Sequence, residues 1–322
     1  MLMVATAEGV WRSGGEVELA GRPVRALAGD GDTWWAIAGG RGLCRREAGG
    51  GWVEVAGTGE DATCLCAAGP GDVLVGTAGA HLRRLDAAGE LAPVTGFESA
   101  EGRSEWYTPW GGPPDTRSLA VGGDGAIYAN VHVGGILRSG DGGRTWSATI
   151  DLHSDVHQVL CPWPDRPEVV VAACADGLAQ SRDGGRSWRL RDDGLDGRYC
   201  RAVAVVGDTV VVSASEGPRG TKAAVYRGPV EGWSPLERCR EGLPEWFGAN
   251  VDTGCLVAGD RLGAGEGVVA GEGLVAGEGL VAGEGLVALV SADGRLFVSS
   301  DLGRSWELAA SGLASPSFLA AA

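Results

Sequence analysis

The chain has 322 residues, of which 57 are Gly, 44% are hydrophobic and 21% are charged, and its formal net charge is −15. This composition has enough apolar mass to fold, and the acidic balance excludes a nucleic-acid phosphate surface as the expected partner, because such binders display basic patches. The high Gly content and the lack of an apolar run long enough to span a bilayer argue against a helical bundle and a membrane protein.

The first residues, MLMVATAEGVW, contain neither a basic leader nor an apolar signal core. The eight Cys show no metal-ligand spacing beyond the isolated pair Cys64 and Cys66. We therefore expect a cytoplasmic, monomeric protein with reduced thiols and many short strands joined by tight turns.

Three segments of the chain share the pattern S-x-D-x-G-x-[ST]-W, which we call the Ser-Asp turns. In such a turn the Asp accepts backbone hydrogen bonds, the Gly allows a positive φ, and the Trp covers apolar neighbours. Their key residues are Ser139, Asp141, Gly143, Trp146, Ser181, Asp183, Gly185, Trp188, Ser299, Asp301, Gly303 and Trp306. The pattern resembles the Asp-box, or BNR, repeat of β-propellers such as sialidases, sortilin-type receptors and photosystem II assembly-factor propellers. This resemblance implies a WD40- or YVTN-like repeat fold in which these residues are structural.

Short strands precede the Ser-Asp turns and recur through the chain at separations typical of four-stranded blades. These third strands are expected at 10–12, 43–45, 82–84, 136–138, 178–180, 225–227 and 296–298. Apolar runs predict the innermost strands at 24–28, 63–67, 117–121, 156–161, 201–206, 254–258 and 317–321.

The last apolar run has no blade after it, whereas the strands expected at 3–7, 10–13 and 17–19 lack a first strand. We predict an all-β fold, a single seven-bladed propeller over 1–322 in which the N- and C-terminal strands share one blade and leave no exposed edge. Residues 263–286 contain four Gly-Glu-Gly repeats and are interpreted as a low-complexity insertion in the sixth blade.

In the propellers that this chain resembles, ligands usually enter on the face that carries the loops between blades. Two aromatic loops, 106–117 and 243–252, fall on that face, where they either bind a partner or cover blade edges. The candidate rim residues are Trp106, Tyr107, Trp110, Trp246 and Phe247.

Polar residues are expected to gather at the channel mouth on the same face. His153, Asp155 and His157 alternate along the chain, so their side chains share one side of a strand. The candidate ligand-binding residues are Asp115, Arg117, Asn130, His132, His153, Asp155, His157, Arg201, Glu216, Asn250 and Asp252. They would bind a small polar ligand, hold a divalent metal through His132, His153 and His157, or satisfy one another and ordered water. No other cofactor is expected.

The resemblance to sialidases implies an Arg-Ile-Pro segment, three arginines that clamp a carboxylate, and a Tyr–Glu pair. The chain has no Arg-Ile-Pro; Arg117 and Arg201 could supply two of the arginines, and no third is apparent in register. We therefore expect a binding or scaffold protein for a small polar ligand or a protein partner.

A glycosidase-like hydrolase or lyase for a small sugar-like substrate is the alternative. Its working groups would be His132, His157, Arg117, Arg201 and Asp252. In a paired-carboxylate version, Asp115 or Asp155 would face Glu216 or Asp252.

Overall fold

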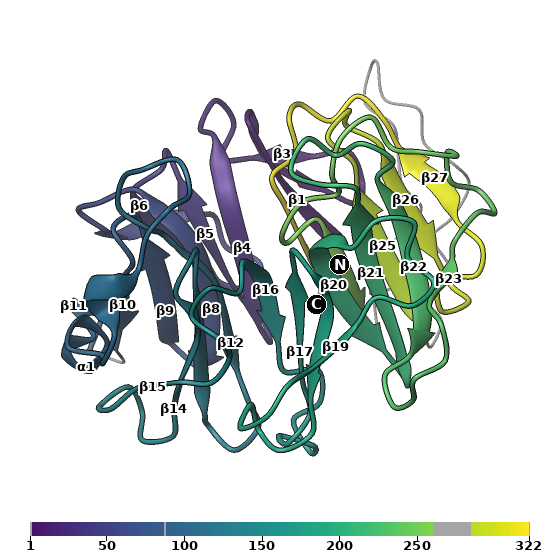
Figure 1. Ribbon diagram of the computed structural model, residues 1–322. Coiled ribbons are helices and arrows are strands. Elements are labelled where there is room, and N and C mark those ends of the chain that lie inside the picture. Colours follow the sequence, from purple (N-terminus) through teal and green to yellow (C-terminus); the bar gives the residue numbers. More distant parts are fainter. Residues whose placement is uncertain (1, 87, 260–284, 322) are drawn as a thin grey trace.

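The computed structural model describes residues 2–86, 88–259 and 285–321. Its strands form seven sheets of four strands, and each first strand contacts the first strands of both neighbouring sheets (Figure 1). The sheets therefore close into a ring, and the predicted seven-bladed β-propeller is confirmed.

The two inner strands of each blade lie nearest the central channel. The first strands are β4 (Val24–Asp30), β8 (Ala62–Gly69), β12 (Thr116–Val121), β16 (Val156–Leu160), β20 (Tyr199–Val206), β24 (Leu256–Gly259) and β28 (Phe318–Ala321). The second strands are β5 (Thr33–Ala38), β9 (Asp72–Thr77), β13 (Ile127–Val131), β17 (Val170–Cys174), β21 (Thr209–Ser215), β25 (Leu286–Val290) and β1 (Leu2–Thr6).

The two outer strands complete each blade, in the same order from the first to the seventh. The third strands are β6 (Gly42–Arg46), β10 (His81–Leu85), β14 (Gly135–Ser139), β18 (Gly177–Ser181), β22 (Ala224–Pro229), β26 (Leu296–Ser299) and β2 (Gly9–Arg12). The fourth strands are β7 (Val53–Gly57), β11 (Leu91–Pro93), β15 (Ser147–Ala148), β19 (Arg189–Arg191), β23 (Glu237–Arg238), β27 (Glu307–Ala310) and β3 (Val17–Glu18). The helix α1 (Thr95–Glu98) and a short 3-10 helix, Arg103–Glu105, lie in the connection between the second and third blades.

The seventh blade is built from both ends of the chain. β28 pairs antiparallel with β1, so that Leu2 lies opposite Ala321 and Val4 opposite Leu319, and the two termini lie together in Figure 1. Because this pairing satisfies the backbone of both terminal strands, the ring has no open seam.

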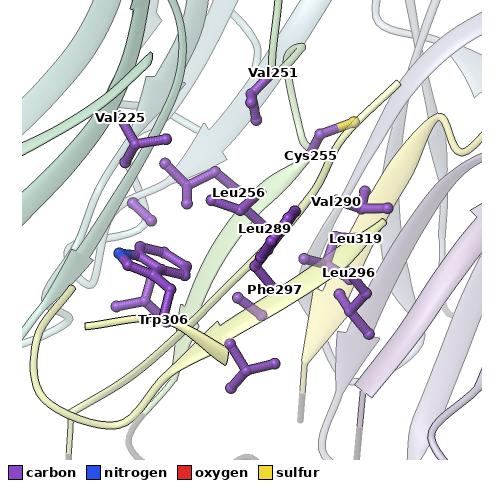
Figure 2. Close-up of a cluster of buried hydrophobic side chains, with 14 of the residues drawn as sticks. Val225, Val251, Cys255, Leu256, Leu289, Val290, Leu296, Phe297, Trp306 and Leu319 are labelled. Atoms are coloured by element: carbon purple, nitrogen blue, oxygen red, sulfur yellow. The ribbon is translucent and has the colours of Figure 1, made fainter. Parts of the chain in front are cut away.

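The core lies between the blades, where each sheet packs against its neighbours. The second strands carry near-continuous apolar runs because both of their faces are covered; β17 and β25, for example, are buried at every residue. Figure 2 shows one such cluster, in which Leu289, Phe297 and Trp306 of the sixth blade lie near Leu319 of β28. This packing connects the C-terminal strand to the core as well as to the sheet.

Each Ser-Asp turn joins a third strand to a fourth strand and is held by its own side chains. In the first turn, the Ser139 hydroxyl accepts a hydrogen bond from the Gly143 N–H at 2.9 Å, and the Asp141 carboxylate accepts one from the Thr145 N–H at 2.9 Å. Hydrogen bonds from the backbone and hydroxyl of Thr145, with one from the Ser139 hydroxyl, lower the pKa of Asp141 to about 2. The other two turns repeat this bonding.

The low-complexity segment predicted at 263–286 lies outside the described residues except for its last two positions. It connects β24 to β25. No helix in the described part of the chain is both long and apolar enough to cross a bilayer.

Candidate functional site

β-Bulges occur at the same place in five of the seven first strands. In β4 the pairing passes from Val24 opposite Ala38 to Ala26 opposite Ile37, so Arg25 has no partner across the ladder. Bulges commonly change the direction of a side chain next to a functional site. The residues left unpaired in this way are Arg25, Thr63, Arg117, His157 and the pair Arg201 and Ala202.

Four of these bulge residues line one cavity of about 510 Å³ at the channel mouth. The loops between blades supply the rest of its wall. The lining residues are Arg25, Thr63, Cys64, Trp110, Asp115, Arg117, His132, Arg201, Asp252, Thr253, Pro316, Ser317 and Phe318. The structure therefore brings together six of the predicted residues: Trp110, Asp115, Arg117, His132, Arg201 and Asp252.

The three arginines of the cavity differ in their partners. The guanidinium of Arg117 lies 3.0 Å from the Asp155 carboxylate, and Nε of Arg201 donates to Asp252 at 2.9 Å. Arg25 is exposed, and no acidic side chain of the described chain forms an ion pair with it. Arg25 is thus the cation of this cavity whose charge is available to a ligand.

Asp115 faces this positive charge from the loop before β12. Burial raises the pKa of the Asp115 carboxyl, while the charges of Arg25 and Arg117 act in the opposite direction. A carboxyl group in such surroundings takes up a proton more readily than an exposed one.

Asp155 connects Arg117 of the cavity wall to two histidines, of which His132 also lines the cavity. Its carboxylate oxygens lie 3.8 Å from Nε2 of His132 and 3.4 Å from Nε2 of His157. Burial acts to raise the pKa of Asp155, but its contacts with His157 and Arg117 outweigh burial and lower the pKa to about 2. Asp155 is therefore a permanent anion at neutral pH.

Both histidines are neutral in the folded protein. Burial, with the nearby charge of Arg117, lowers the pKa of His132 to about 4, and burial lowers the pKa of His157. The Nδ1–H of His157 donates to the Cys200 carbonyl, and its Nε2 accepts from the Tyr199 hydroxyl at 3.1 Å. Because the single proton of the neutral ring is on Nδ1, Nε2 acts only as an acceptor, so His157 positions Tyr199 and donates no hydrogen bond to Asp155.

His153 does not join this cluster. It is exposed in the loop before β16, where its ring centre lies 6.4 Å from that of Tyr107. Among the described residues, no group of three His, Cys, Asp or Glu side chains has an arrangement that fits a metal ion. The residues proposed for a divalent metal therefore do not fit such a centre.

Three other predicted residues lie away from the cavity. Asn130 is buried and its amide donates to the Val156 carbonyl at 2.9 Å, which joins the third and fourth blades. Glu216 pairs with Lys222 at 2.6 Å. Asn250 lines a smaller neighbouring cavity of about 240 Å³ that shares Arg201 and Asp252 with the first.

The aromatic loops are only partly on the rim. Trp110 is 74% exposed, with its ring against His132, and Tyr107 is 42% exposed. Trp106 and Phe247 are buried, which corrects the prediction for both, because each packs on an aromatic core residue instead of facing solvent. Trp246 is half-buried, with the Arg238 guanidinium 3.5 Å from its ring centre. An aromatic loop covers blade edges as well as the site.

Arg25 is the main residue that sequence reasoning missed, and it corrects the expectation that no third arginine lies in register. The signal was present, because Arg25 follows Val24 at the start of an apolar run just as Arg117 follows Thr116 and Arg201 follows Cys200. Arg25 can be matched to Arg117 and Arg201 only when the β-bulge in each first strand is known, and the sequence pattern does not show where a bulge occurs.

No protein-family model and no curated protein matches the chain. Solved structures do resemble it. A GH74 enzyme from Niastella koreensis has a TM-score of 0.60 at 13% identity, over 96% of this chain and 47% of that one. An ancestral GH74 enzyme has a TM-score of 0.59 at 14% identity, over 96% of this chain and 40% of that one.

YCF48 from Cyanidioschyzon merolae has a TM-score of 0.58 at 16% identity, over 92% of this chain and 86% of that one. The two GH74 enzymes are longer proteins, and this chain spans less than half the length of each. At these identities the likeness shows the shared propeller fold alone.

Proposed function

We propose that this protein is a binding protein whose channel mouth holds a small ligand through a carboxylate or similar anionic group. The observation that carries the proposal is the convergence of Arg25, Arg117 and Arg201 on one cavity of about 510 Å³. Guanidinium groups hold carboxylates with charge-assisted, often paired hydrogen bonds. The cavity volume is within the usual range for small-molecule sites.

The unequal pairing of the arginines supports a single anionic group next to Arg25. Asp155 and Asp252 already neutralise Arg117 and Arg201, whereas Arg25 has no acidic partner in the described chain. Arg25 therefore offers an anion a guanidinium group with which no side chain of the described chain forms an ion pair. Asp115, which forms no ion pair in the described chain, then remains available for a hydroxyl or ammonium group elsewhere on the ligand.

Calorimetric titration tests this proposal. Glutarate and N-acetylneuraminate serve as carboxylate probes and glucose as the neutral control. We expect saturable binding of a carboxylate, with affinity that falls about tenfold or more in Arg25→Gln because one charge-assisted contact is lost. Arg41→Gln is the matched control, since Arg41 lies on a neighbouring turn and pairs with Asp61 outside the cavity. Binding that is equal in both variants would contradict the proposal.

A hydrolase is the second candidate, and one observation favours it. The pKa of Asp115 is raised while that of Asp155 is lowered to about 2, and glycosidases divide the roles of acid and base between such carboxyl groups. The GH74 enzymes share the propeller fold. Release of nitrophenol from nitrophenyl glycosides, lost in Asp115→Asn, would support this candidate; no turnover by the wild-type protein would exclude it for these substrates.

The finer features of the proposal rest on the sequence. The resemblance of the three Ser-Asp turns to the Asp-box repeat supports a place in that group of propellers. Exposed Trp110 and Tyr107 offer a rim for a protein partner in addition to the small ligand. A cytoplasmic, monomeric state remains part of the proposal.

A further inference from the structure

On the face opposite the channel mouth, each of the three Ser-Asp turns accepts a hydrogen bond from the blade before it. In the third blade Tyr128 pairs across the sheet with Arg138, whose guanidinium carbon lies 5.8 Å from the Tyr128 ring centre. The Tyr128 hydroxyl donates to the carbonyl of Gly184, in the Ser-Asp turn of the next blade, at 3.0 Å. The turn of one blade thus caps a pair of side chains on the blade before it.

The other two Ser-Asp turns do the same with an arginine as the donor. Arg84 of the second blade donates to the Gly142 carbonyl at 3.0 Å, and Arg227 of the fifth blade donates to the Leu302 carbonyl at 3.0 Å. Gly185 lies so close that a Cβ there would be 3.2 Å from the Tyr128 ring. A turn with Gly at its tip and an outward carbonyl is therefore what fits this position.

The first blade has the same pair of side chains but no such turn over it. Trp35 lies opposite Arg45, whose guanidinium carbon is 5.6 Å from the Trp35 ring centre, as in the third blade. Leu85 of the second blade stands where the turns carry their Ser, because it pairs with Val73 as Ser139 pairs with Ile127.

The connection after Leu85 is short, and the hydrogen bonds of its Asp86 side chain are to its own backbone. The Asp86 carboxylate accepts from the N–H groups of Ala88 and Glu90 at 2.9 and 3.1 Å. Within the described residues it supplies no carbonyl to Arg45, which pairs with Glu47 instead. A cavity of about 560 Å³ lies at this place, lined by residues that include Trp35, Arg45, Leu85 and Asp86.

The wall of this cavity combines a buried aromatic ring with exposed apolar side chains. Trp35 is only 1% exposed, and its indole Nε1 is buried without a hydrogen-bond partner in the described chain, as are those of Trp11 and Trp188. Val55, which lines the cavity, and Val53 beside it are 39% and 62% exposed, so the cavity continues into an apolar edge on β7.

The charge around the cavity indicates what would fill it. Asp30 and Asp86 both line it, and Glu47 neutralises Arg45, its one basic residue. The surroundings are therefore acidic. The Ser-Asp turns that fill the equivalent positions carry Arg directly after the Gly pair or Leu-Gly pair, at 144, 186 and 304.

We propose that the cavity between the first and second blades is a docking site for a basic, glycine-containing peptide turn of a partner protein. The turn occupies the position that the second blade leaves without a Ser-Asp turn. Its tip carbonyl accepts a hydrogen bond from Arg45, its flat side packs on Val55, and its basic side chain meets Asp30 and Asp86. This site is on the opposite face from the ligand cavity and is independent of it.

The probe for this site is the synthetic peptide SRDGGRSW, the sequence of residues 181–188. Nuclear magnetic resonance of the ¹⁵N-labelled full chain follows the indole N–H signal of Trp35, assigned through Trp35→Phe. We expect this signal to shift saturably at millimolar peptide, whereas the same peptide with Ala in place of both Gly gives no shift, because Ala disfavours the positive φ of the turn.

Two variants place the binding in the cavity. Arg45→Gln should weaken the peptide about tenfold or more through loss of a charge-assisted hydrogen bond, while Arg41→Gln, on the other face, should leave it unchanged. In a further, grafted variant, Leu85→Ser is combined with replacement of residues 86–90 by the sequence of residues 182–188. This grafted turn should fill the cavity, raise the melting temperature and abolish the peptide-induced shift.

The absence of any Trp35 shift in the wild-type protein would overturn the proposal. So would a shift that persists in the grafted variant or is unaffected by Arg45→Gln. If the grafted chain fails to fold, Arg45→Gln and the Ala-substituted peptide still decide the outcome.

Discussion

Replacement of His132 by Gln should remove a large part of the sensitivity of this fold to mild acid. His132 is 5% exposed, lies 3.8 Å from Asp155, and is faced by Arg117, His157 and Arg201. Burial and the two arginines lower its pKa from 6.5 to about 4. The unfolded chain therefore binds a proton near the ordinary pKa, whereas the folded chain resists it until the pH falls to about 4.

The direction in which stability changes with pH follows from this difference in proton uptake. Between 6.5 and about 4 the unfolded state holds more protons, so the free energy of unfolding decreases as the pH falls through this window. One pKa unit corresponds to about 1.4 kcal/mol, so the contribution of His132 reaches at most about 3.5 kcal/mol. His157 acts in the same direction. Asp155 acts below this window, because its stabilising effect is lost only as the pH falls through 3.8 toward about 2.

Urea denaturation at about pH 7 and about pH 4.5 measures the effect. We expect the wild-type protein to lose about 2 to 3 kcal/mol more than His132→Gln between these two conditions. The His132→Gln variant retains the destabilisation that comes from protonation of His157, so its free energy of unfolding should still decrease as the pH falls. Equal losses in both proteins would refute the assignment of a buried, neutral His132.

Other predictions concern packing, closure and thiol reactivity. Trp306→Ala should cost about 3 to 5 kcal/mol in thermal or urea unfolding, because Trp306 is 3% exposed, whereas Trp110→Ala, at 74% exposure, should change stability little. Deletion of residues 318–322 should abolish cooperative unfolding in calorimetry and promote association seen by light scattering, since it leaves β1 as an open edge; a monomeric variant with the wild-type transition would contradict this. Burial raises the pKa of Cys64 and Cys255 to about 12, so iodoacetamide should label neither until urea unfolds the chain, as followed by peptide mass spectrometry.

Much of the architecture followed from local sequence. The three Ser-Asp turns bring every group that they need within eight residues, so their hydrogen bonds form wherever the segment occurs. The short repeats that precede the Ser-Asp turns placed the seven third strands, and the apolar runs placed the seven first strands. The unmatched run at 317–321 predicted the closure by β28, because a propeller with an unpaired strand at each end has one solution that leaves no edge.

The ligand cavity depended on contacts between distant parts of the chain. Arg25, Arg117 and Arg201 are far apart in sequence and meet only because bulges at equivalent places in three strands direct them to one mouth. A bulge shifts the register of strand pairing, and the strand propensities of the residues do not indicate where it occurs. Likewise Trp106 and Trp110 lie in one loop, yet only the packing of Phe97 and Trp146 decides that the first is buried and the second exposed.

The sequence by itself determined the turns, the strands and the closed ring, since these rest on short-range hydrogen bonding and on apolar runs that recur along the chain. Only the tertiary structure decided which polar residues face the cavity, which aromatic residues reach solvent, and where a second cavity forms between the first and second blades. The physical reason is that these features depend on how neighbouring blades pack against one another, and that packing joins residues which no local pattern relates.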